Sequence, residues 1–424
     1  MPALPDSWYT QTATPFPALP RLAGEIRADV VILGAGITGL STAIELAERG
    51  YSVAVLEAQR VGWGASGRSG GQIIFGYGCE QAKLTRLLGA DAARRLFQWS
   101  VEGVRLIDQR VAKYAIDCDL RRGHAHAAIK TRQVEELRHF QDELQALGYV
   151  GTELWDQEQL QQRLATRRYR ALLFDPRSGH LHPLNYTLGL ARAAQSLGVR
   201  IFEDSAVTRI DRSDPVVFHT AGGQLRAGFG VIAGNAWLSG IAPELEAKIM
   251  PVGTYIGATE VLGAERARGL IGNDMAVADI NFVLDYFRLS RDQRLLFGGR
   301  VSYSRLPPPG LKARMRSRML AVFPELVDVA IESAWGGYVD ISMNRAPHWG
   351  RLCPNLYFAQ GFSGHGIAAT GLAGRVIAEA IVGQSERLDL YARIPHHPFP
   401  GGPWLRTPAL VLAMTWFRLM DLRP

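Results

Sequence analysis

One segment, between residues 28 and 57, constrains the fold of this 424-residue chain more than any other stretch. It opens with the apolar run DVVILG, passes through a glycine-rich turn, and continues as a helix whose apolar residues recur at i, i+3, i+4 and i+7. Those residues are Leu40, Ala43, Ile44 and Ala47. A second buried run, SVAVLE, follows. The pattern predicts a strand–helix–strand unit with parallel strands and a right-handed crossover.

The turn in this unit carries GxGxxG at Gly34, Gly36 and Gly39, in the context that distinguishes a dinucleotide site from a chance match. The first glycine permits the tight turn, the second lets the backbone approach a pyrophosphate, and the third allows close helix–strand packing. The helix N-terminus, which includes Thr38, offers unpaired N–H groups to phosphates. Glu57 is expected to accept hydrogen bonds from the adenosine ribose, which excludes NADP but leaves NAD and FAD open.

A second glycine-rich stretch, RVGWGASGRSGG at residues 60–71, separates these two cofactors. A nicotinamide cofactor needs no such segment, whereas the ribityl and flavin parts of FAD must pass protein backbone at close range. Ser66 and Arg68 are expected to donate to the pyrophosphate. Gly70 and Gly71 leave room beside the flavin, with Gln72 next to them. A flexible glycine loop without a ligand is the alternative.

Two further blocks support FAD. The strand VIAGNAW ends at Gly234, where flavin domains close their sheet, and Val207 precedes it as a further expected cofactor contact. The segment GFSGHGIAATG places several N–H groups at the start of a helix, and these expected contacts are Gly364, His365, Gly366 and Ile367. A helix N-terminus aimed at the N1–C2=O edge of the flavin would stabilise the negative charge of the reduced ring. The cofactor predicted from the residues is FAD.

Composition excludes several classes of protein. The formal charge of +7 is carried in mixed-sign context without a basic tract, so no nucleic-acid partner is expected. The chain has three cysteines, Cys79, Cys118 and Cys353, without CxxC spacing, which predicts no disulfide framework, no metal site and a cytoplasmic location. The N-terminus lacks the features of a signal peptide. The apolar tail 407–422 favours core or oligomer packing over the alternative of membrane docking.

The length predicts two domains. The strand–turn–helix pattern returns near residue 356, and alternating residues between 216 and 300 indicate an antiparallel sheet. We therefore expect an α/β plus α+β fold, in which a discontinuous Rossmann-type FAD-binding domain carries an inserted antiparallel-sheet substrate domain. The first domain is assigned residues 1–85, 150–235 and 335–390, the second residues 86–149 and 236–334, and a C-terminal helical tail residues 391–424.

These blocks, in this order, resemble the D-amino-acid oxidase, glycine oxidase and sarcosine oxidase superfamily. The stretches RVGWGASGRSGGQ, SGHLHPLNY, DYFRLSRDQRLLFGGR, WGGYVDISMNRAPHWGRL and GFSGHG are most similar to its γ-glutamylputrescine oxidase branch, which also holds oxidases of cyclic imino acids such as pipecolate. The resemblance implies oxidation of a CH–NH bond to an imine by hydride transfer to flavin N5. It also implies a small amine or imino acid as substrate and molecular oxygen as acceptor, with hydrogen peroxide as product.

The chain departs from its relatives in two places. WGGYVDISM contains no cysteine, whereas some relatives attach the flavin covalently in this segment, so non-covalent FAD is expected. RLLFGGR lacks the lysine that sarcosine-oxidase-like members use to activate oxygen. A membrane-docked dehydrogenase with a quinone acceptor therefore stays open beside the oxidase.

The candidate catalytic residues are His365, Arg300, His182, Tyr286 and Trp335. Arg300 could bind a substrate carboxylate or form a structural ion pair. His182 could contact substrate or be a satisfied structural histidine, and an imidazole pKa near neutrality would let His365 accept an amine proton. Tyr286 and Trp335 could form an aromatic wall or pack in the core. Two further candidate anion binders, ranked lower, are Arg288 and Arg345.

Overall fold

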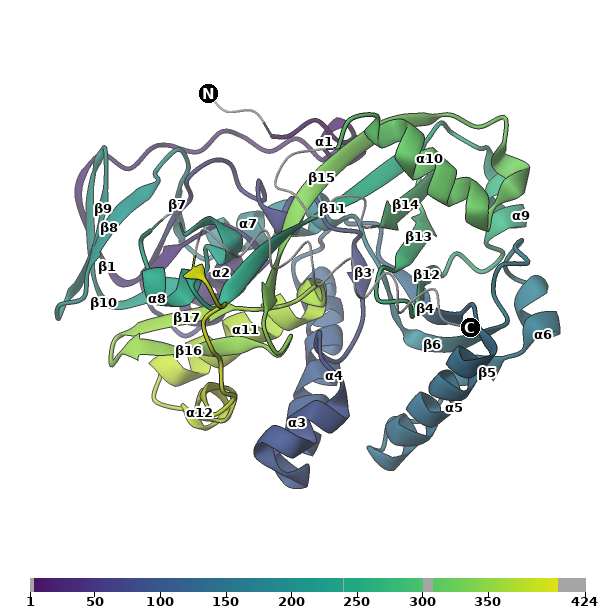
Figure 1. The fold of residues 1–424 in the computed structure, drawn as a ribbon. Helices are drawn as coiled ribbons and strands as arrows, with labels where there is room; N and C mark the ends of the chain where they lie inside the picture. Colours follow the sequence, from purple (N-terminus) through teal and green to yellow (C-terminus); the bar gives the residue numbers. More distant parts are fainter. Residues whose placement is uncertain (1–3, 239, 300–307, 403–424) are drawn as a thin grey trace.

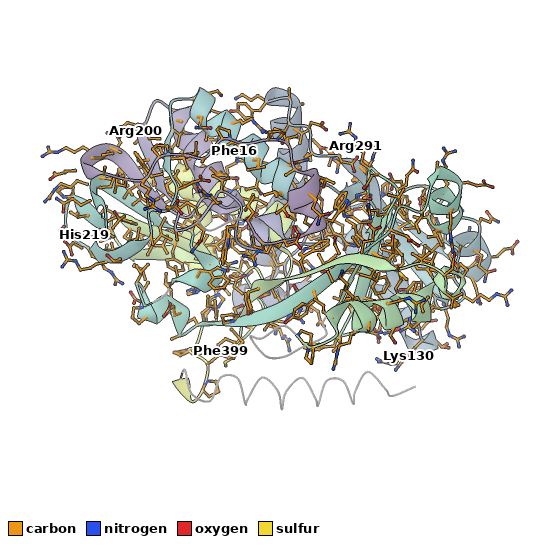
Figure 2. The ribbon with its side chains drawn as sticks, turned by 90° about the horizontal axis from the view of Figure 1, so that it is seen from above. Phe16, Lys130, Arg200, His219, Arg291 and Phe399 are labelled. Atoms are coloured by element: carbon orange, nitrogen blue, oxygen red, sulfur yellow. The ribbon has the colours of Figure 1, made fainter. Side chains whose placement is uncertain are left out.

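The computed structural model describes residues 4–238, 240–299 and 308–402. Two β-sheets form the framework, one at each end of the molecule (Figure 1). Figure 2, turned by 90°, keeps them apart: His219 lies at the end of the first sheet and Lys130 at the end of the second. Arg300 and the tail 407–422, both singled out in the sequence, lie outside the described residues.

The first sheet has eight strands in the order β16-β17-β10-β1-β2-β7, with β8 and β9 on its side branch. Their bounds are β1 (Gly24–Leu33), β2 (Val53–Leu56), β7 (Arg200–Phe202), β8 (Val207–Asp211), β9 (Val216–Thr220), β10 (Gly223–Ile232), β16 (His348–Cys353) and β17 (Leu356–Gln360). The strands β7, β2, β1, β10 and β17 run parallel. Where both faces are covered, as along Val30–Leu33 and Val53–Leu56, successive residues are apolar rather than alternating. The Rossmann-type core predicted from the sequence is confirmed.

The second sheet has nine strands in the order β15-β11-β14-β13-β12-β4-β6-β3, with β5 paired to β6. Their bounds are β3 (Gln72–Ile73), β4 (Arg121–Ala128), β5 (Glu153–Trp155), β6 (Ala171–His180), β11 (Ile249–Thr259), β12 (Ala276–Asp279), β13 (Asp285–Leu289), β14 (Leu295–Gly299) and β15 (Ile331–Ser342). All pairs are antiparallel except β12 with β4. Strands β11 and β15 are the long pair that runs across the centre of Figure 1.

The helices are α1 (Trp8–Thr12), α2 (Ile37–Ala47), α3 (Gln81–Leu88), α4 (Ala90–Lys113), α5 (Thr131–Ala146), α6 (Gln157–Gln161), α7 (Pro183–Ser196), α8 (Pro243–Glu246), α9 (Ala264–Leu270), α10 (Leu311–Val322), α11 (Gly366–Ile381) and α12 (Glu386–Ala392). Short 3₁₀ turns are η1 (Ala65–Gly67), η2 (Asn235–Trp237) and η3 (Pro324–Leu326). Helix α11 packs against both α2 and α4. Gly374 of α11 allows the close packing against α2, because an added Cβ there would lie 2.5 Å from Ser41 Cβ.

The domain boundaries expected from the sequence remain a prediction. Four strands of the second sheet do not follow them: β3, β5 and β6 fall within the ranges assigned to the FAD-binding domain, and β15 straddles residue 335. Within the described residues, no single helix is long and apolar enough to cross a membrane. The bent pair α11 and α12 passes that test only when taken together, with 118° between its members.

Candidate functional site

The turn between β1 and α2 can be built only with glycine. Gly34 has a φ of +102°, in the left-handed region that side chains disfavour, and a Cβ there would lie 2.7 Å from Ala233 O. A Cβ on Gly39 would lie 2.0 Å from Gly34 O. Gly36 is the N-cap of α2, so the N–H groups that follow it, including that of Thr38, belong to the first helical turn and have no acceptor within the helix. The turn is therefore a set of donors suited to a phosphate.

Glu57 lies at the carboxyl end of β2, beside this turn. Its Oε2 accepts a hydrogen bond from Ala35 N at 2.8 Å and its Oε1 accepts one from Gln59 N at 2.9 Å. Burial raises the pKa of this carboxyl, and the two N–H groups act in the opposite direction. The carboxylate is thus held rigidly next to the glycine turn, where the sequence placed a ribose contact.

The segment 60–71 runs along the same helix N-terminus. Ser66 Oγ accepts a hydrogen bond from Ile37 N at 3.0 Å, and a Cβ on Gly36 would lie 2.8 Å from that oxygen. The guanidinium of Arg68 stacks over the Trp63 ring at 4.2 Å, and its Nε donates to Trp63 O at 2.7 Å. Its Nη2 is buried and has no hydrogen-bond partner among the described residues. Because the guanidinium is desolvated by burial, the Arg68 pKa is lowered to about 10. Its unpartnered Nη2 is therefore available to an acidic group.

The end of this segment, at Gly70 and Gly71, packs closely against the second sheet. A Cβ on Gly70 would lie 2.5 Å from the Tyr286 ring, and one on Gly71 would lie 2.1 Å from Leu181 O. Gln72 begins β3, where its Nε2 donates to Val277 O at 3.1 Å and its Oε1 contacts His124 Nε2 at 3.2 Å. The glycines therefore allow the backbone to pass between the two sheets.

The turn before α11 is organised by Asp340, at the end of β15. Its carboxylate accepts hydrogen bonds from Gly361 N and Phe362 N, and its carbonyl accepts one from Ser363 N at 3.0 Å. Burial raises the pKa of Asp340 to about 7. This carboxyl group fixes the loop from which Gly364, His365, Gly366 and Ile367 begin the helix, and no sequence pattern predicted its role.

His365 is the N-cap of α11, and its Nδ1 is buried without a hydrogen-bond partner among the described residues. Burial, together with the nearby Arg345 guanidinium and the His126 ring, lowers its pKa to about 3. The expectation of an imidazole that titrates near neutrality is therefore wrong. A neutral His365 ring is better suited to accept a hydrogen bond than to take up a proton from the substrate amine.

The two lower-ranked candidate anion binders, Arg288 and Arg345, lie in different surroundings. Arg288 is 1% exposed, and its nitrogens donate to Gly70 O, Leu289 O, Tyr9 Oη and Leu181 O, so it is a structural link between segments. Arg345 makes no ion pair with any described acid and its Nε is buried without a partner. Its guanidinium lies 5.4 Å from the Phe282 ring centroid, and burial lowers its pKa.

The remaining candidates are placed as follows. His182 caps α7: its Nδ1 accepts from Asn185 N at 3.1 Å and its Nε2 contacts Thr12 Oγ1 at 3.1 Å, which favours the structural alternative. Burial lowers its pKa to about 3. The indole N–H of Trp335 donates to Arg68 O at 3.1 Å, so this residue supports the 60–71 segment.

Two contacts expected near the cofactor lie in the first sheet. Gly234 follows β10, and a Cβ there would lie 2.8 Å from both Leu33 Cδ2 and Leu238 Cδ2. Val207 begins β8 and is buried in the same apolar cluster as Leu33 and Leu56. Their contact with the cofactor stays a prediction.

Comparison with known proteins identifies the family. The model of the family described as DAO, FAD dependent oxidoreductase, matches residues 29–380. This chain belongs to the DAO family of FAD-dependent oxidoreductases. Its relatives and structural neighbours oxidise amines and amino acids, and the FAD cofactor predicted from the glycine-rich blocks is confirmed.

Several individual proteins are similar to this chain. A γ-glutamylputrescine oxidoreductase from Escherichia coli (strain K12) is 40% identical over 417 residues, which cover 98% of each chain. A probable oxidoreductase OrdL from Haemophilus influenzae is 42% identical over 413 residues, covering 96% of this chain and 94% of the relative. The solved structure of glycine oxidase from Geobacillus kaustophilus shares the fold, with a TM-score of 0.73 at 20% identity, and covers 88% of this chain and 100% of its own.

The residues of this site fit FAD. Gly34, Gly39, Gly70 and Gly71 leave no room for side chains, and Arg68 Nη2 and His365 Nδ1 are buried polar atoms that need partners. We propose that the β1–α2 turn, Glu57 and the 60–72 segment hold the dinucleotide part, and that the first turn of α11 faces the flavin ring.

Proposed function

We propose that this enzyme oxidises the CH–NH bond of γ-glutamylputrescine, or of a related γ-glutamylated amine, to an imine, with oxygen as acceptor and hydrogen peroxide as product. The observation that carries this proposal is the 40% identity to a γ-glutamylputrescine oxidoreductase across 98% of both chains. Bound FAD supplies the two-electron acceptor for the substrate C–H bond. The protein then has to bind the substrate, orient it and keep its amine neutral.

Arg345 supplies the feature that such a substrate requires. A γ-glutamyl group carries a free carboxylate at the end remote from the amine that is oxidised. Arg345 offers a desolvated guanidinium with an unpartnered Nε, next to the N-terminus of α11. A charged group buried without a partner is costly, so a carboxylate from the substrate would stabilise it.

His365 is proposed to accept a hydrogen bond from the substrate amine. Its ring is neutral over the physiological range because its pKa is lowered to about 3, and its Nδ1 has no partner among the described residues. A neutral acceptor does not repel an amine, and it stabilises the ammonium form less than a carboxylate would. Arg345 and His365 together thus bind opposite ends of a bifunctional substrate.

The test is steady-state turnover of the FAD-loaded enzyme on γ-glutamylputrescine, putrescine and L-pipecolate, followed by oxygen uptake and peroxide formation. We expect turnover with γ-glutamylputrescine and a kcat/KM at least about 30-fold lower for putrescine, because loss of a buried charge partner costs about 2–5 kcal/mol. Preference for L-pipecolate would select the imino acid alternative. Reduction of the flavin without oxygen uptake would select another acceptor, such as a quinone.

Variants of Arg345 distinguish a loss of carboxylate binding from a general loss of folded enzyme. Arg345→Met should lower kcat/KM for γ-glutamylputrescine by about 30-fold or more while leaving putrescine within about threefold. Arg345→Lys keeps the charge but not the planar fork, and should restore part of the difference. An equal loss on both substrates would contradict a role in carboxylate binding.

A further inference from the structure

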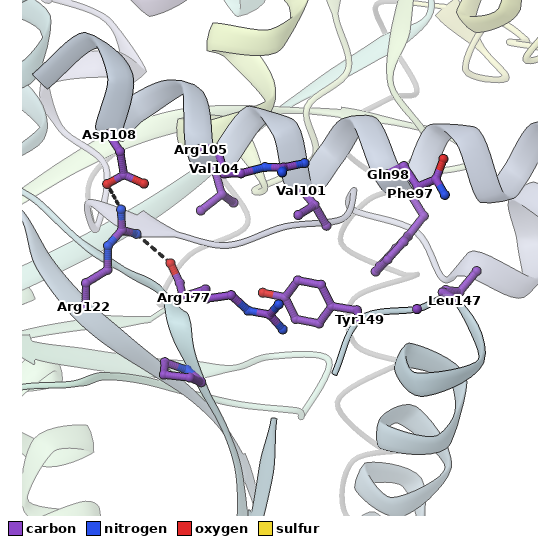
Figure 3. A pocket seen from close by; sticks show the side chains of 12 residues that line it. Phe97, Gln98, Val101, Val104, Arg105, Asp108, Arg122, Leu147, Tyr149 and Arg177 are labelled. Carbon is purple, nitrogen blue, oxygen red and sulfur yellow. Dashed lines mark hydrogen bonds and ion pairs between the residues drawn. The ribbon is translucent and has the colours of Figure 1, made fainter. Parts of the chain in front are cut away.

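A groove on α4, shown in Figure 3, is lined by none of the residues proposed to hold FAD. Its volume is about 670 Å³, which falls within the range of small-molecule sites. One wall is a single face of α4, from Phe97 to Asp108, and the other is the chain around residues 147–149 and 176–177. Eleven helical steps of about 1.5 Å make the groove roughly 16 Å long.

The inner part of the groove is apolar. Phe97, Val101 and Val104 occur at i, i+4 and i+7 on α4 and face Leu147 and Tyr149 across the groove (Figure 3). Phe97, Val104 and Tyr149 are buried, whereas Val101 and Leu147 are only half-buried. Covering the exposed parts of these apolar side chains with a ligand is favourable, because it removes apolar surface from water.

The rim of the groove is basic. It contains three arginines, Arg105, Arg122 and Arg177, and a single acid, Asp108. Arg122 forms an ion pair with Asp108 and donates to Arg177 O at 2.6 Å, so the acid is already neutralised. Arg177 also has an acid nearby, Asp175, at 3.7 Å, so the excess over the apolar wall is one positive charge, that of Arg105.

These two arginines differ in how far they are engaged. The guanidinium of Arg177 lies 3.5 Å from the Tyr149 ring centroid, its Nη2 donates to Val150 O, and its Nε is 3.7 Å from Asp175 Oδ1. Arg105 is exposed and forms no hydrogen bond or ion pair with any described residue. Arg177 is therefore a fixed cation and Arg105 a cation that can turn toward a ligand.

We infer that this groove binds a small amphipathic carboxylate, whose apolar chain lies along Phe97, Val101 and Leu147 and whose carboxylate is held by Arg105 and Arg177. Carboxylate–guanidinium pairs are among the stronger hydrogen-bonded contacts, and the apolar wall selects against small polar anions. The excess positive charge selects against cations of the same chain length. This inference does not depend on the identity of the oxidised amine.

The aromatic residues behind the groove keep its ligand away from the flavin. Phe75 follows the 60–72 segment and packs against Tyr149 and Phe97, with ring centroids 4.5 and 5.7 Å apart. The next residue, Gly76, donates through its N–H to Ser100 Oγ of α4 at 2.8 Å. The ligand should therefore bind without displacing the amine substrate.

The experiment is titration of the FAD-loaded enzyme with octanoate by isothermal calorimetry, with acetate and octylammonium as matched probes. We expect saturable binding of one octanoate per chain, with at least tenfold weaker binding of acetate and of octylammonium. Arg105→Glu should weaken octanoate binding at least tenfold. Arg94→Glu is the control, because Arg94 is an exposed arginine of α4 that does not line the groove.

A second readout covers changes elsewhere in the molecule. Flavin absorbance and the KM for the amine should be unchanged in Arg105→Glu, since this exposed residue lies outside the FAD site. Octanoate should not raise the KM for the amine. Absence of saturable octanoate binding, equal affinity in Arg105→Glu, equal binding of octylammonium, or competition with the amine would each overturn the inference.

Discussion

At the scale of single residues, the glycines of the FAD site differ sharply in what they permit. A Cβ at Gly39 would meet the backbone of Gly34 at 2.0 Å, and the backbone cannot move away as a flexible side chain could. Gly64, within the second glycine-rich segment, has no atom within 4 Å of such a Cβ and a φ of −74°. Not every glycine in these segments is therefore required.

This difference gives a matched pair of variants. Gly39→Ala should lower FAD retention by about tenfold or more, because the β1–α2 turn has to open to admit the methyl group. Gly64→Ala should leave FAD retention unchanged. The measurement is the ratio of flavin to protein absorbance after purification and dialysis. Equal retention by both variants would contradict the proposed role of the β1–α2 turn in holding FAD.

Asp340 links its own ionisation to the turn at the start of α11. Burial raises its folded pKa to about 7, above the unfolded value near 3.8. The folded state therefore binds the extra proton between about pH 4 and pH 7, and stability contributed by this group falls as pH rises through that window, by at most about 1.4 kcal/mol per pH unit.

Asp340→Asn should remove this slope. It should also cost about 1–2 kcal/mol, since an NH2 group that cannot accept a hydrogen bond replaces one of the two carboxylate oxygens that now face Gly361 N and Phe362 N. Thermal unfolding of both proteins between pH 4 and pH 8 measures the two effects separately. Identical pH dependence in the two proteins would show that another group is responsible.

At the scale of helices and strands, α2, α4 and α11 are joined by one buried carboxylate. Glu45 of α2 is 4% exposed and pairs with Arg110 of α4 at 3.2 Å and with Arg375 of α11 at 2.9 Å. Burial alone would raise the Glu45 pKa, but the attraction of these arginines outweighs it, so the pKa is lowered. The stability that Glu45 contributes is thus present above its unfolded pKa and is lost as pH falls through the folded value.

Glu45→Gln should destabilise the fold by about 3–5 kcal/mol, because it leaves the buried Arg110 without an acidic partner among the described residues, whereas Arg375 keeps Glu102 at 3.3 Å. The control is Glu48→Gln, at the C-cap of the same helix. Glu48 is exposed and pairs with Lys113 at 2.9 Å, so the loss there should stay below about 1 kcal/mol. Urea unfolding followed by fluorescence gives both values, and similar losses would exclude a special role for the Glu45 cluster.

At the scale of the whole molecule, the FAD site is assembled from segments far apart in the chain. The β1–α2 turn, the 60–72 segment and the first turn of α11 meet only because the first sheet brings β1, β10 and β17 side by side. The 60–72 segment then passes between this sheet and the second. Cofactor loss should therefore loosen contacts between the two sheets rather than within either.

The mode of FAD attachment is tested on the intact protein. The WGGYVDISM segment, which forms most of β15 and the residues after it, contains no cysteine. Acid precipitation should therefore release all yellow colour into the supernatant, where the absorbance of free FAD is measured. Colour retained in the pellet would show a covalent bond at another residue.

The sequence by itself determined the nucleotide unit and the cofactor. Periodicity and glycine spacing are local signals, so the strand–turn–helix from Gly24 to Ala47, the return of that pattern before α11 and the choice of FAD over NAD could be predicted. The ranking of the substrate residues could not. Arg288 and Arg345 have equally basic side chains in the sequence, and only their surroundings make one a structural link and the other an unpaired cation.

The tertiary structure alone decided the groups that depend on burial and on distant partners. The sequence contains no signal for Asp340, whose role follows from its contact with a turn more than twenty residues later, or for the lowered pKa of His365, which comes from desolvation and neighbouring cations. The same holds for the α4 groove, where arginines from three elements meet over an apolar helix face. Local pattern thus sets the cofactor, while long-range packing sets the charges that face the substrate.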